Sequence, residues 1–421
     1  MTESVCVHGL GYIGLPTAAV LAHQGYDVTG YDTNGDVRRE VAEGRLHFEE
    51  IGLESLVRSV VDAGKLSVTT EVPPADYHLI CVPTPLTEAN QPNLSYVKSA
   101  AVEVSEALRK DDTVITESTV PPGTSHEVIR PILERSNNRE AGKSFGLAYC
   151  PETVLPGDLL SELRKNDRVI GGIDDRSRNK GMKLYRSFCE GKLYCTDLTS
   201  AEFVKLVQNA SRDVEIAFAN QIARLAREFD AKPSEIIRLA NTHPRVEMLS
   251  PGPGVGGHCL PVDPWFLTDS DADTSLIETA RQINDSMPGY VVSIVQSEIE
   301  LTPEKKVAVL GIAYKGNVSD TRNSPAVRII ELLEQQAKSI EASPSVSLTD
   351  PYVSDNVYNI RSVEDALSGA DIAVLVTDHD EYRELQPGPV SEWMEGRVII
   401  DMRNLLNAEQ WERAGFTVQQ L

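Results

Sequence analysis

The sequence lacks the long apolar runs and the cysteine pairs that several classes of protein need. No run approaches the roughly 18 apolar residues of a membrane-spanning helix, so we expect no membrane segment. The six cysteines are scattered without metal-type spacing, which predicts reduced thiols, no disulfide framework and no bound metal. Lysine is also scarce, at 14 of the 40 basic residues.

Positive charge is in short supply relative to negative charge. The chain has 40 Lys and Arg against 63 Asp and Glu, a formal net charge of −23, which argues against binding nucleic acid because the phosphate backbone would be repelled. An acidic, lysine-poor surface suits a high-salt cytoplasm. The start of the chain enters a strand-like pattern without a basic segment and an apolar stretch before it, so we expect a cytoplasmic location.

The first strand-like run leads into a Gly-x-Gly-x-x-Gly motif. Gly9 would make the tight turn, Gly11 would let a pyrophosphate approach the backbone, and Gly14 would let helix and strand pack closely. A second strand-like run ends at Asp32, where a carboxylate would bind the adenosine ribose and repel a 2′-phosphate. Strand, motif, helix, strand and acid in this order predict a Rossmann-like domain that binds NAD in preference to NADP.

The strand pattern continues, and several strands end in polar residues. Thr84 and Thr119 follow runs at 77–82 and 113–117, where ligands of open α/β sheets bind, although turn chemistry explains them equally well. Glu152 follows the run 146–150. It is a candidate general base or a solvated loop carboxylate.

A long helical pattern runs from residue 199 to about 230. Thr199 and Glu202 form a possible capping box. Lys205, Asn209 and Arg212 follow at i, i+4 and i+7 and share one face, which is either a solvated stripe or the lining of a site. Further helical patterns cover 233–242, 276–285 and 290–301, and we expect Pro288-Gly289 to separate the last two.

Residues 251–264 combine four glycines and four prolines, which excludes helix or strand and predicts a shaped loop. Cys259 lies on this loop beside His258, and Asp263 follows four residues later. A thiol on such a loop is suited to covalent catalysis at a carbonyl carbon, whereas the alternative is a small buried apolar side chain.

From residue 307 a second α/β pattern begins, with strands near 307–311, 346–350, 371–376 and 398–401. It has no complete Gly-x-Gly-x-x-Gly motif. Lys315, Arg322 and Arg403 lie near strand ends and suit the phosphates of a different nucleotide. The predicted fold class is therefore α/β, with two Rossmann-like doubly wound domains (1–198 and 301–421) joined by a central helical region (199–300).

In combination, Gly-Gly-His-Cys-x-x-x-Asp and the upstream Lys-x-x-x-Asn make the chain resemble the UDP-glucose/GDP-mannose dehydrogenase family from Gly9 to about Asn404. Asp213-Val after Arg212, together with His243-Pro-Arg245, resembles the family branch that oxidises UDP-N-acetyl-D-mannosamine. Thr153 departs from that branch, which usually has arginine there. The choice of hexosamine epimer therefore stays open.

The resemblance implies roles for residues in all three predicted domains. The implied catalytic residues are Cys259 as nucleophile, Lys205, Asn209, Asp263 and Glu152. Those implied to bind NAD are Gly9, Gly11, Tyr12, Ile13, Gly14, Asp32, Thr84 and Thr119. Those implied to bind a UDP-sugar are Thr153, Val154, Lys205, Asn209, Arg212, His243, Arg245, Gly256, Tyr314, Lys315, Arg322 and Arg403.

The implied reaction is the NAD-dependent, four-electron oxidation of the C6 alcohol of a UDP-hexosamine to the uronate, through a thiohemiacetal and a thioester on Cys259. UDP-N-acetylmannosamine is the first expected substrate, followed by UDP-N-acetylglucosamine and UDP-glucose. The alternatives are a single-step dehydrogenase that needs no thiol and a non-catalytic NAD-binding sensor. The central helices are expected to form a homodimer.

Overall fold

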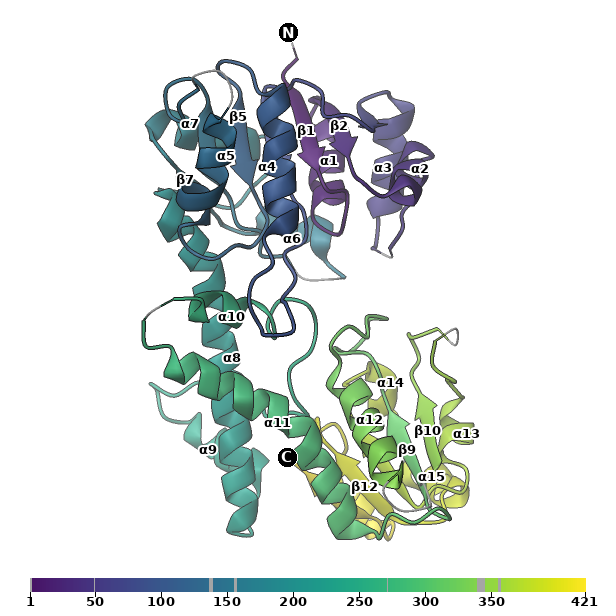
Figure 1. The fold of residues 1–421 in the computed structure, drawn as a ribbon. Helices are drawn as coiled ribbons and strands as arrows, with labels where there is room; N and C mark the ends of the chain where they lie inside the picture. Colours follow the sequence, from purple (N-terminus) through teal and green to yellow (C-terminus); the bar gives the residue numbers. More distant parts are fainter. Residues whose placement is uncertain are drawn as a thin grey trace. The chain divides into compact units, whose positions relative to one another are not determined.

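The computed structural model describes residues 2–48, 50–135, 139–154, 157–270, 272–338, 345–354 and 357–421. The chain divides into two compact units (Figure 1). The first comprises residues 1–208 and 265–271, and the second comprises residues 209–264 and 272–421. Among the described residues, no helix is long and apolar enough to cross a membrane. The proposed three-domain division and cytoplasmic location stay predictions.

The first unit is built on an eight-stranded sheet with the order β3-β2-β1-β4-β5-β6-β7-β8. The first six strands in this order are parallel, and β7 and β8 run antiparallel to them. The strand order reverses between β1 and β4, where open α/β sheets bind their ligands. The strands are β1 (Ser4–His8), β2 (Asp27–Tyr31), β3 (Leu66–Thr69), β4 (Tyr77–Ile80), β5 (Thr113–Thr116), β6 (Gly146–Tyr149), β7 (Arg168–Gly172) and β8 (Leu193–Thr196).

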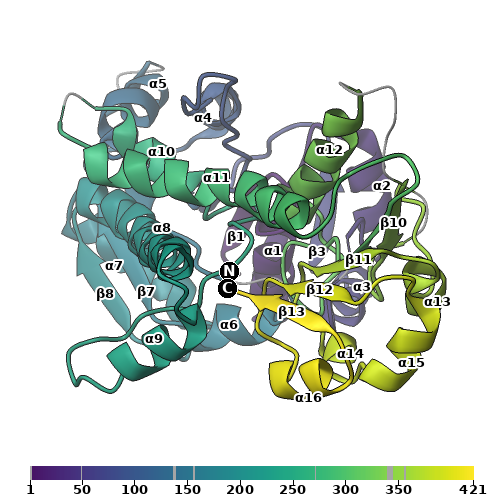
Figure 2. The same ribbon diagram turned by 90° about the horizontal axis from the view of Figure 1, so that it is seen from below.

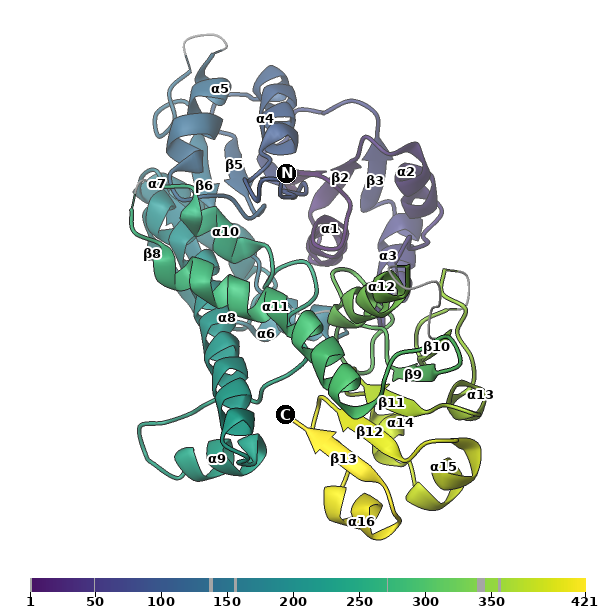
Figure 3. The ribbon, with the colours of Figure 1, turned by 60° about the horizontal axis from the view of Figure 1, so that its bottom comes forward.

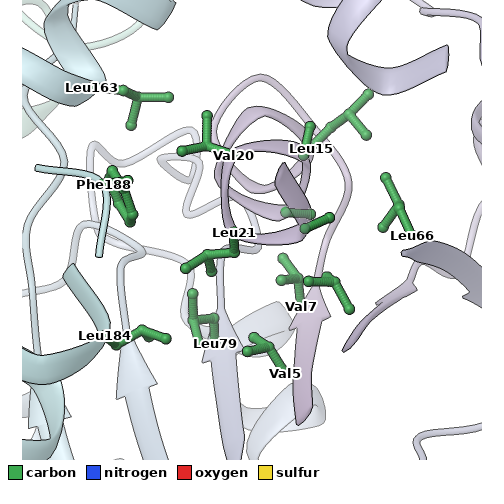
Figure 4. Packing of buried hydrophobic residues seen from close by; sticks show 14 of the residues in the cluster. Val5, Val7, Leu15, Val20, Leu21, Leu66, Leu79, Leu163, Leu184 and Phe188 are labelled. Carbon is green, nitrogen blue, oxygen red and sulfur yellow. The ribbon is translucent and has the colours of Figure 1, made fainter. Parts of the chain in front are cut away.

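Helices cover both faces of this sheet. One apolar core packs α1, α3, α6 and α7 on one face, and Figure 4 shows Leu15, Val20 and Leu21 of α1 over the strands. A second core packs α4, α5 and the start of α8 on the other face. The helices are α1 (Gly14–His23), α2 (Gly35–Ala42), α3 (Leu53–Asp62), α4 (Ser95–Ala107), the π-helical turn η1 (Ser125–Ile129), α5 (Arg130–Glu134), α6 (Leu159–Lys165), α7 (Asp175–Arg186) and α8 (Leu198–Glu228).

The second unit contains a five-stranded parallel sheet with the order β10-β9-β11-β12-β13, in which β13 forms one edge (Figure 2). This is the flavodoxin-like 2-1-3-4-5 order, which reverses between β9 and β11. The strands are β9 (Lys306–Leu310), β10 (Ser345–Thr349), β11 (Ile372–Leu375), β12 (Val398–Asp401) and β13 (Thr417–Gln420).

Two apolar cores cover this second sheet. Helices α11 and α12 pack on one face together with Ala223 of α8, and α13 to α16 pack on the other. Helix α8 crosses α11 (Figure 3), and side-chain hydrogen bonds join the two helices. The helices after α8 are α9 (Pro233–Ala240), α10 (Asp263–Thr268), α11 (Ser275–Glu298), α12 (Pro325–Lys338), α13 (Val363–Leu367), α14 (Asp380–Arg383), α15 (Pro387–Trp393) and α16 (Ala408–Arg413).

The predicted fold class is confirmed, whereas one predicted helix boundary is wrong. Residues 275–298 form a single helix with Pro288 inside it, where we expected two helices separated at Pro288-Gly289. Proline removes one hydrogen bond, to the carbonyl four residues earlier. Buried Met287 and Val291 pack on either side of Pro288 and hold the helix against the core.

Two histidines lie in the interior of the first sheet. His8 Nε2 and His78 Nδ1 are 3.4 Å apart, and both side chains are fully buried. Burial lowers the pKa of His8 to about 3 and that of His78 to about 4, so both rings are neutral at pH 7. With Cys6 they form the one group of three among the described residues whose ligand atoms, within 4.8 Å of one another, could hold a metal ion.

The buried histidines should make the fold sensitive to acid. In the unfolded chain each ring takes up a proton near pH 6.5, whereas in the folded chain it does so only near pH 3 to 4. The unfolded state therefore binds more protons between these values. Each histidine should lower the free energy of unfolding by about 1.4 kcal/mol per pH unit as pH falls through this window.

We predict that the melting temperature of the double variant His8→Leu, His78→Leu falls less than that of the wild type when the pH is lowered from 6.5 to 4.5. Thermal unfolding followed by circular dichroism measures this difference. Exposed His23→Leu is the control and should follow the wild type. Parallel curves for the double variant and the wild type would contradict the assignment.

Candidate active site

The dinucleotide loop has the geometry that its glycines predict. Gly9 has φ of +89°, and a Cβ there would lie 2.8 Å from the Cys81 carbonyl oxygen. A Cβ on Gly14 would lie 1.9 Å from the Gly9 carbonyl oxygen, because α1 begins against the turn. A Cβ on Gly11, by contrast, would meet no protein atom within 4 Å. Protein packing therefore does not require glycine at position 11, and the open backbone there suits a pyrophosphate.

Polar groups surround this loop at the carboxyl ends of the strands. Asp32 follows β2, and its carboxylate accepts hydrogen bonds from the Leu10 and Asn34 N–H groups, both at 2.8 Å. Half-buried Thr84 and Thr119 follow β4 and β5. The structure thus places all three at the carboxyl edge of the sheet that carries the dinucleotide loop.

Glu50 is a residue that sequence reasoning missed. Its carboxylate accepts a hydrogen bond of 2.6 Å from the Tyr12 hydroxyl and bonds of 3.1 Å from the N–H groups of Gly157 and Leu159. It therefore joins the dinucleotide loop to the segment that begins α6. No local motif could reveal it, because its backbone partners lie more than 100 positions away in the sequence.

Glu152 is a buried ion-pair partner and not a solvated loop carboxylate. One carboxylate oxygen accepts the N–H groups of Thr153 and Val154 at 2.7 and 2.9 Å, and the other accepts Arg168 Nη1 at 3.1 Å. Arg168 and Glu152 are both about nine-tenths or more buried. The ion pair with Arg168 thus fixes the Glu152 carboxylate at the end of β6. The same carboxylate holds the backbone of the two residues that follow it.

A second buried carboxylate lies behind this pair. Glu117 accepts hydrogen bonds from the Tyr185 hydroxyl at 2.5 Å and the Cys81 thiol at 3.3 Å. Burial raises the pKa of Glu117, and the neighbouring Glu152 raises it further, whereas Arg168 opposes the shift. Arg168 is thus a buried cation that lies beside two buried acids, Glu117 and Glu152.

The predicted capping box at the start of α8 is wrong. Asp197 caps the helix, since it accepts hydrogen bonds from the N–H and hydroxyl of Ser200 at 2.9 and 2.7 Å. Glu202 accepts instead the N–H groups of Gly123 and Ser125 at 2.6 and 2.8 Å. The buried Glu202 carboxylate thus binds the backbone of the segment after β5 and not the first turn of its own helix, α8.

Helix α8 presents a polar face one turn further on. Lys205 is buried, Asn209 is half-buried, and the Asn209 side-chain amide donates a hydrogen bond of 2.5 Å to Asp263. Arg212 lies exposed on the helix surface. The polar face continues instead through buried Asp213 and Asn220, whose spacing of i+4 and i+11 from Asn209 keeps them in line with it.

The thiol loop, defined here as residues 251–262, packs closely against the rest of the second unit. A Cβ on Gly256 would lie 2.7 Å from the Tyr314 side chain, and Gly257 has φ of +88° with the Tyr314 ring at 3.0 Å from the corresponding position. The Gly257 N–H donates to the Arg322 carbonyl oxygen at 3.0 Å. Cys259 is half-buried, and its carbonyl oxygen accepts the Asp263 N–H at 2.8 Å, where α10 begins.

Further residues predicted to bind the UDP-sugar lie in three places of the second unit. Tyr314, exposed Lys315 and exposed Arg322 lie in the segment after β9, at the point where the strand order reverses. Burial, together with the charges of Asp320 and Cys259, raises the pKa of Tyr314 to about 12, so its hydroxyl stays protonated. Arg403 donates through Nε to the Val376 carbonyl oxygen at 2.8 Å. His243 and Arg245 lie exposed on the loop after α9.

These features define a class of protein. The first unit carries a doubly wound sheet with a dinucleotide loop, and the second carries a half-buried thiol beside an Asn209–Asp263 pair and a second nucleotide-type switch point. A thiol adds to carbonyl carbons, and a dinucleotide cofactor exchanges hydride with alcohols and aldehydes. The combination is that of a dehydrogenase.

Comparison with known proteins identifies the family. Three family models match in sequence: the NAD binding, central and UDP binding domains of the UDP-glucose/GDP-mannose dehydrogenase family match residues 3–189, 199–286 and 308–408. The chain belongs to this family. It is an NAD-dependent nucleotide-sugar dehydrogenase, as its sequence resemblance predicted.

Individual relatives agree with this assignment. The chain is 42% identical to a UDP-N-acetyl-D-mannosamine dehydrogenase of Methanococcus aeolicus, over 100% of this chain and 95% of that protein. It is 40% identical to an NDP-N-acetyl-D-galactosaminuronic acid dehydrogenase of Ralstonia nicotianae, over 97% of each chain. The solved structure of a UDP-D-ManNAc dehydrogenase from Pyrococcus horikoshii superposes with a TM-score of 0.91 at 39% identity, covering 99% of this chain and 98% of that one.

Gly11 and Gly14 of the dinucleotide loop provide a matched test of which glycine serves NAD binding and which serves packing. We predict that Gly11→Ala keeps the wild-type melting temperature but weakens NAD binding about ten-fold or more, equivalent to about 1.4 kcal/mol. Gly14→Ala should instead destabilise the fold by about 1–3 kcal/mol, because the added Cβ overlaps the Gly9 carbonyl. Calorimetric NAD titration and thermal unfolding measure the two effects, and unchanged NAD affinity in Gly11→Ala would contradict the assignment.

Proposed function

We propose that the protein oxidises the C6 alcohol of UDP-N-acetyl-D-mannosamine to the carboxylate, with Cys259 as the covalent nucleophile. The observation that carries this proposal is the half-buried Cys259 on a closely packed loop, with Asn209 and Asp263 hydrogen-bonded at the end of that loop. Names of relatives at 40–42% identity support the sugar.

The cofactor fits the residues of the first unit. Gly9, Gly11 and Gly14 would hold the pyrophosphate, Tyr12 and Ile13 would line the turn, and Asp32 would bind the adenosine ribose. When bound, NAD would supply the hydride acceptor for each of the two oxidations. Thr84 and Thr119 would lie at the carboxyl edge beside it.

The proposed chemistry on the sugar proceeds in balanced steps. The C6 alcohol loses a proton and a hydride to become an aldehyde, and the Cys259 sulfur adds to the aldehyde carbon to give a thiohemiacetal. Loss of a second proton and hydride gives a thioester, and water then cleaves the carbon–sulfur bond, releasing the carboxylate and the free thiol. A thiol serves well because it adds readily and leaves well.

Charged and amide groups would take the remaining roles. Lys205 and Asn209 would stabilise the oxyanion that develops on the C6 oxygen, which is usually the largest contribution in such steps. Asp263 and Glu152 would act on the water that cleaves the thioester. The buried Arg168 fixes the Glu152 carboxylate in one orientation.

The substrate contacts divide between the two units. Thr153, Val154 and Arg212 would face the sugar, whereas Tyr314, Lys315, Arg322 and Arg403 would bind the UDP part. Thr153 and Val154 bond Glu152 through their backbone N–H groups, so this contact does not depend on their side chains. Other side chains at these positions, suited to another sugar, would keep it. Gly256 is packed against Tyr314, and His243 and Arg245 stay predicted substrate contacts.

The decisive experiment is the NADH yield per limiting sugar. UDP-N-acetylmannosamine should give two NADH per molecule, and UDP-N-acetylglucosamine, UDP-N-acetylgalactosamine and UDP-glucose should give little. Cys259→Ala should keep NAD binding and lose turnover, and Lys205→Met should lose about 100- to 1,000-fold. Exposed Lys110→Met is the control.

Each other outcome identifies a different function. Full turnover in Cys259→Ala with one NADH per sugar would indicate a single-step dehydrogenase. NAD binding without NADH from any sugar would indicate a non-catalytic NAD-binding protein. Two NADH from another sugar would keep the mechanism and change the substrate.

We also propose a homodimer through helix α8. Phe203, Val207, Phe218 and Leu225 are 44–55% exposed, and at about 100° per residue they fall within about 60° of one another around the helix. Exposed apolar stripes of this kind mark protein interfaces. Leu239 of α9 is also half exposed.

Light scattering should give the mass of two 46.1-kDa chains for the wild type and of one chain for Phe218→Asp. The control is Ile51→Asp, which changes an 81% exposed side chain elsewhere and should remain dimeric. A monomeric wild type would remove the proposal.

A further inference from the structure

A buried polar network joins α8 to α11. Arg281 Nη1 donates to Asp213 at 2.6 Å, and the Asn284 amide donates to the side chain and the carbonyl oxygen of Asp213 at 2.9 and 3.0 Å. The Asn220 amide donates in turn to the Asn284 side-chain oxygen at 2.9 Å. All four side chains are at most 1% exposed, so this network spans the interface between the two helices.

The network ends on the thiol loop. The Asn220 side-chain oxygen accepts the Gly252 N–H at 2.9 Å. Asn284 also approaches the loop through its backbone, since a Cβ on Gly254 would lie 3.3 Å from the Asn284 carbonyl oxygen. Pro288 has no N–H to bond that carbonyl, and its ring lies at 3.4 Å from the same position of Gly254.

The same helix therefore holds the thiol loop near its start and directly after its end. Asn220 binds Gly252, and Asn209 binds Asp263. The two amides are eleven positions apart on α8 (209 to 220), or about 16 Å along the helix axis. Gly252 and Asp263 are also eleven positions apart, and Cys259 lies between them on the segment that runs antiparallel to α8.

Stability alone does not explain this network. Burying an arginine and an aspartate removes both from water, and apolar side chains of similar volume are often as stable or more stable. Buried polar networks can instead specify one arrangement of the surrounding elements. In this network the directed bonds to Asp213 Oδ1 and between the two asparagines do so, while Asp213 Oδ2 and Arg281 Nε have no hydrogen-bond partner. Arg281 also bonds Asp285, which is partly exposed, so the arginine is held between two carboxylates.

We propose that Asn220, Asn284, Asp213 and Arg281 are positioning residues that fix the thiol loop along α8 and so set the place of Cys259 relative to Asn209 and Asp263. They touch neither the reacting carbon nor the cofactor. They act through Gly252, seven residues before the thiol. This inference rests on the proposed catalytic role of Cys259.

Asn220→Ala tests the proposal because it removes the bond to Gly252 and leaves the ion pair in place. We expect kcat to fall at least about ten-fold, since small displacements of reacting groups cost that much or more. The KM for NAD should stay unchanged, because the dinucleotide loop belongs to the other unit. Mass spectrometry should show that iodoacetamide alkylates Cys259 at a rate changed by about three-fold or more from the wild type.

The matched control is Asp371→Ala, which removes a mostly buried 2.8 Å hydrogen bond from the Lys306 N–H at the amino end of β9, the end of the sheet opposite Tyr314 and its contacts with the thiol loop. It should leave kcat and the alkylation rate unchanged, even if it lowers the melting temperature as much as Asn220→Ala does. Equal changes in both variants, or wild-type kcat and alkylation in Asn220→Ala, would overturn the proposal.

A second pair of variants keeps the proposal testable if Asn220→Ala does not fold. Arg281→Lys retains the charge and should keep most of the turnover. The double variant Asp213→Asn, Arg281→Met removes both charges together, so it avoids a lone buried charge. It should fold and show reduced kcat with a changed Cys259 alkylation rate. A folded double variant with wild-type values of both would overturn the proposal.

The alkylation rate also separates this inference from the proposed function. If Cys259→Ala keeps turnover, the covalent mechanism fails, yet the alkylation of Cys259 in Asn220→Ala still reports whether the network holds the loop. If Cys259→Ala is inactive and Asn220→Ala alkylates like the wild type, the mechanism stands and the network is only structural.

Discussion

The side chains of one helix control the geometry of the candidate site. Helix α8 is 31 residues long and joins the two compact units. Glu202 binds the turn after β5 near its start, and Arg227 donates to the backbone of Gln420 at 3.3 Å near its end. Between these points Asn209 and Asn220 hold the thiol loop. Because a helix is regular, its periodicity fixes the spacing of the contacts that Asn209, Asn220 and Arg227 make within the second unit.

The two faces of α8 have separate tasks. At about 100° per residue, Lys205, Asn209, Asp213 and Asn220 lie within about 80° of one another, roughly opposite the exposed apolar stripe that contains Phe218. On the polar face, Asn209 binds Asp263 and Asn220 binds Gly252, whereas the apolar stripe is exposed. A partner on the apolar stripe could therefore bind without displacing the polar face.

Spacing along the chain predicted much of the fold and part of the site. The dinucleotide loop, the long helix, the Asn209 position and the thiol loop follow from local patterns. Glu50, Arg168 and Arg281 could not be predicted, because each is defined by a partner that folding brings close from far away in sequence. The sequence analysis also did not predict the strands β3, β7, β8 and β13. Strand β8, for example, is a weakly covered edge strand in which buried and exposed residues do not alternate.

The second sheet shows how buried polar groups can organise a binding edge. Asp350, at the end of β10, accepts the N–H groups of Ile312 and Ala313 at 2.7 and 3.0 Å and contacts His379 Nε2 at 3.0 Å. The His379 Nδ1 atom accepts the Asn317 N–H at 2.9 Å, so the ring carries its proton on Nε2 and donates it to Asp350.

One buried Asp–His pair thus holds both ends of the segment 312–317. These bonds hold the pKa of Asp350 at about 2 despite its burial, because the charged form receives them. Lys315 lies within this segment and is exposed where the strand order reverses. A flexible lysine binds phosphate as a point charge, so the rigidity of the site has to come from the backbone beneath it. In both units, therefore, buried side chains fix a loop whose exposed residues meet the ligand.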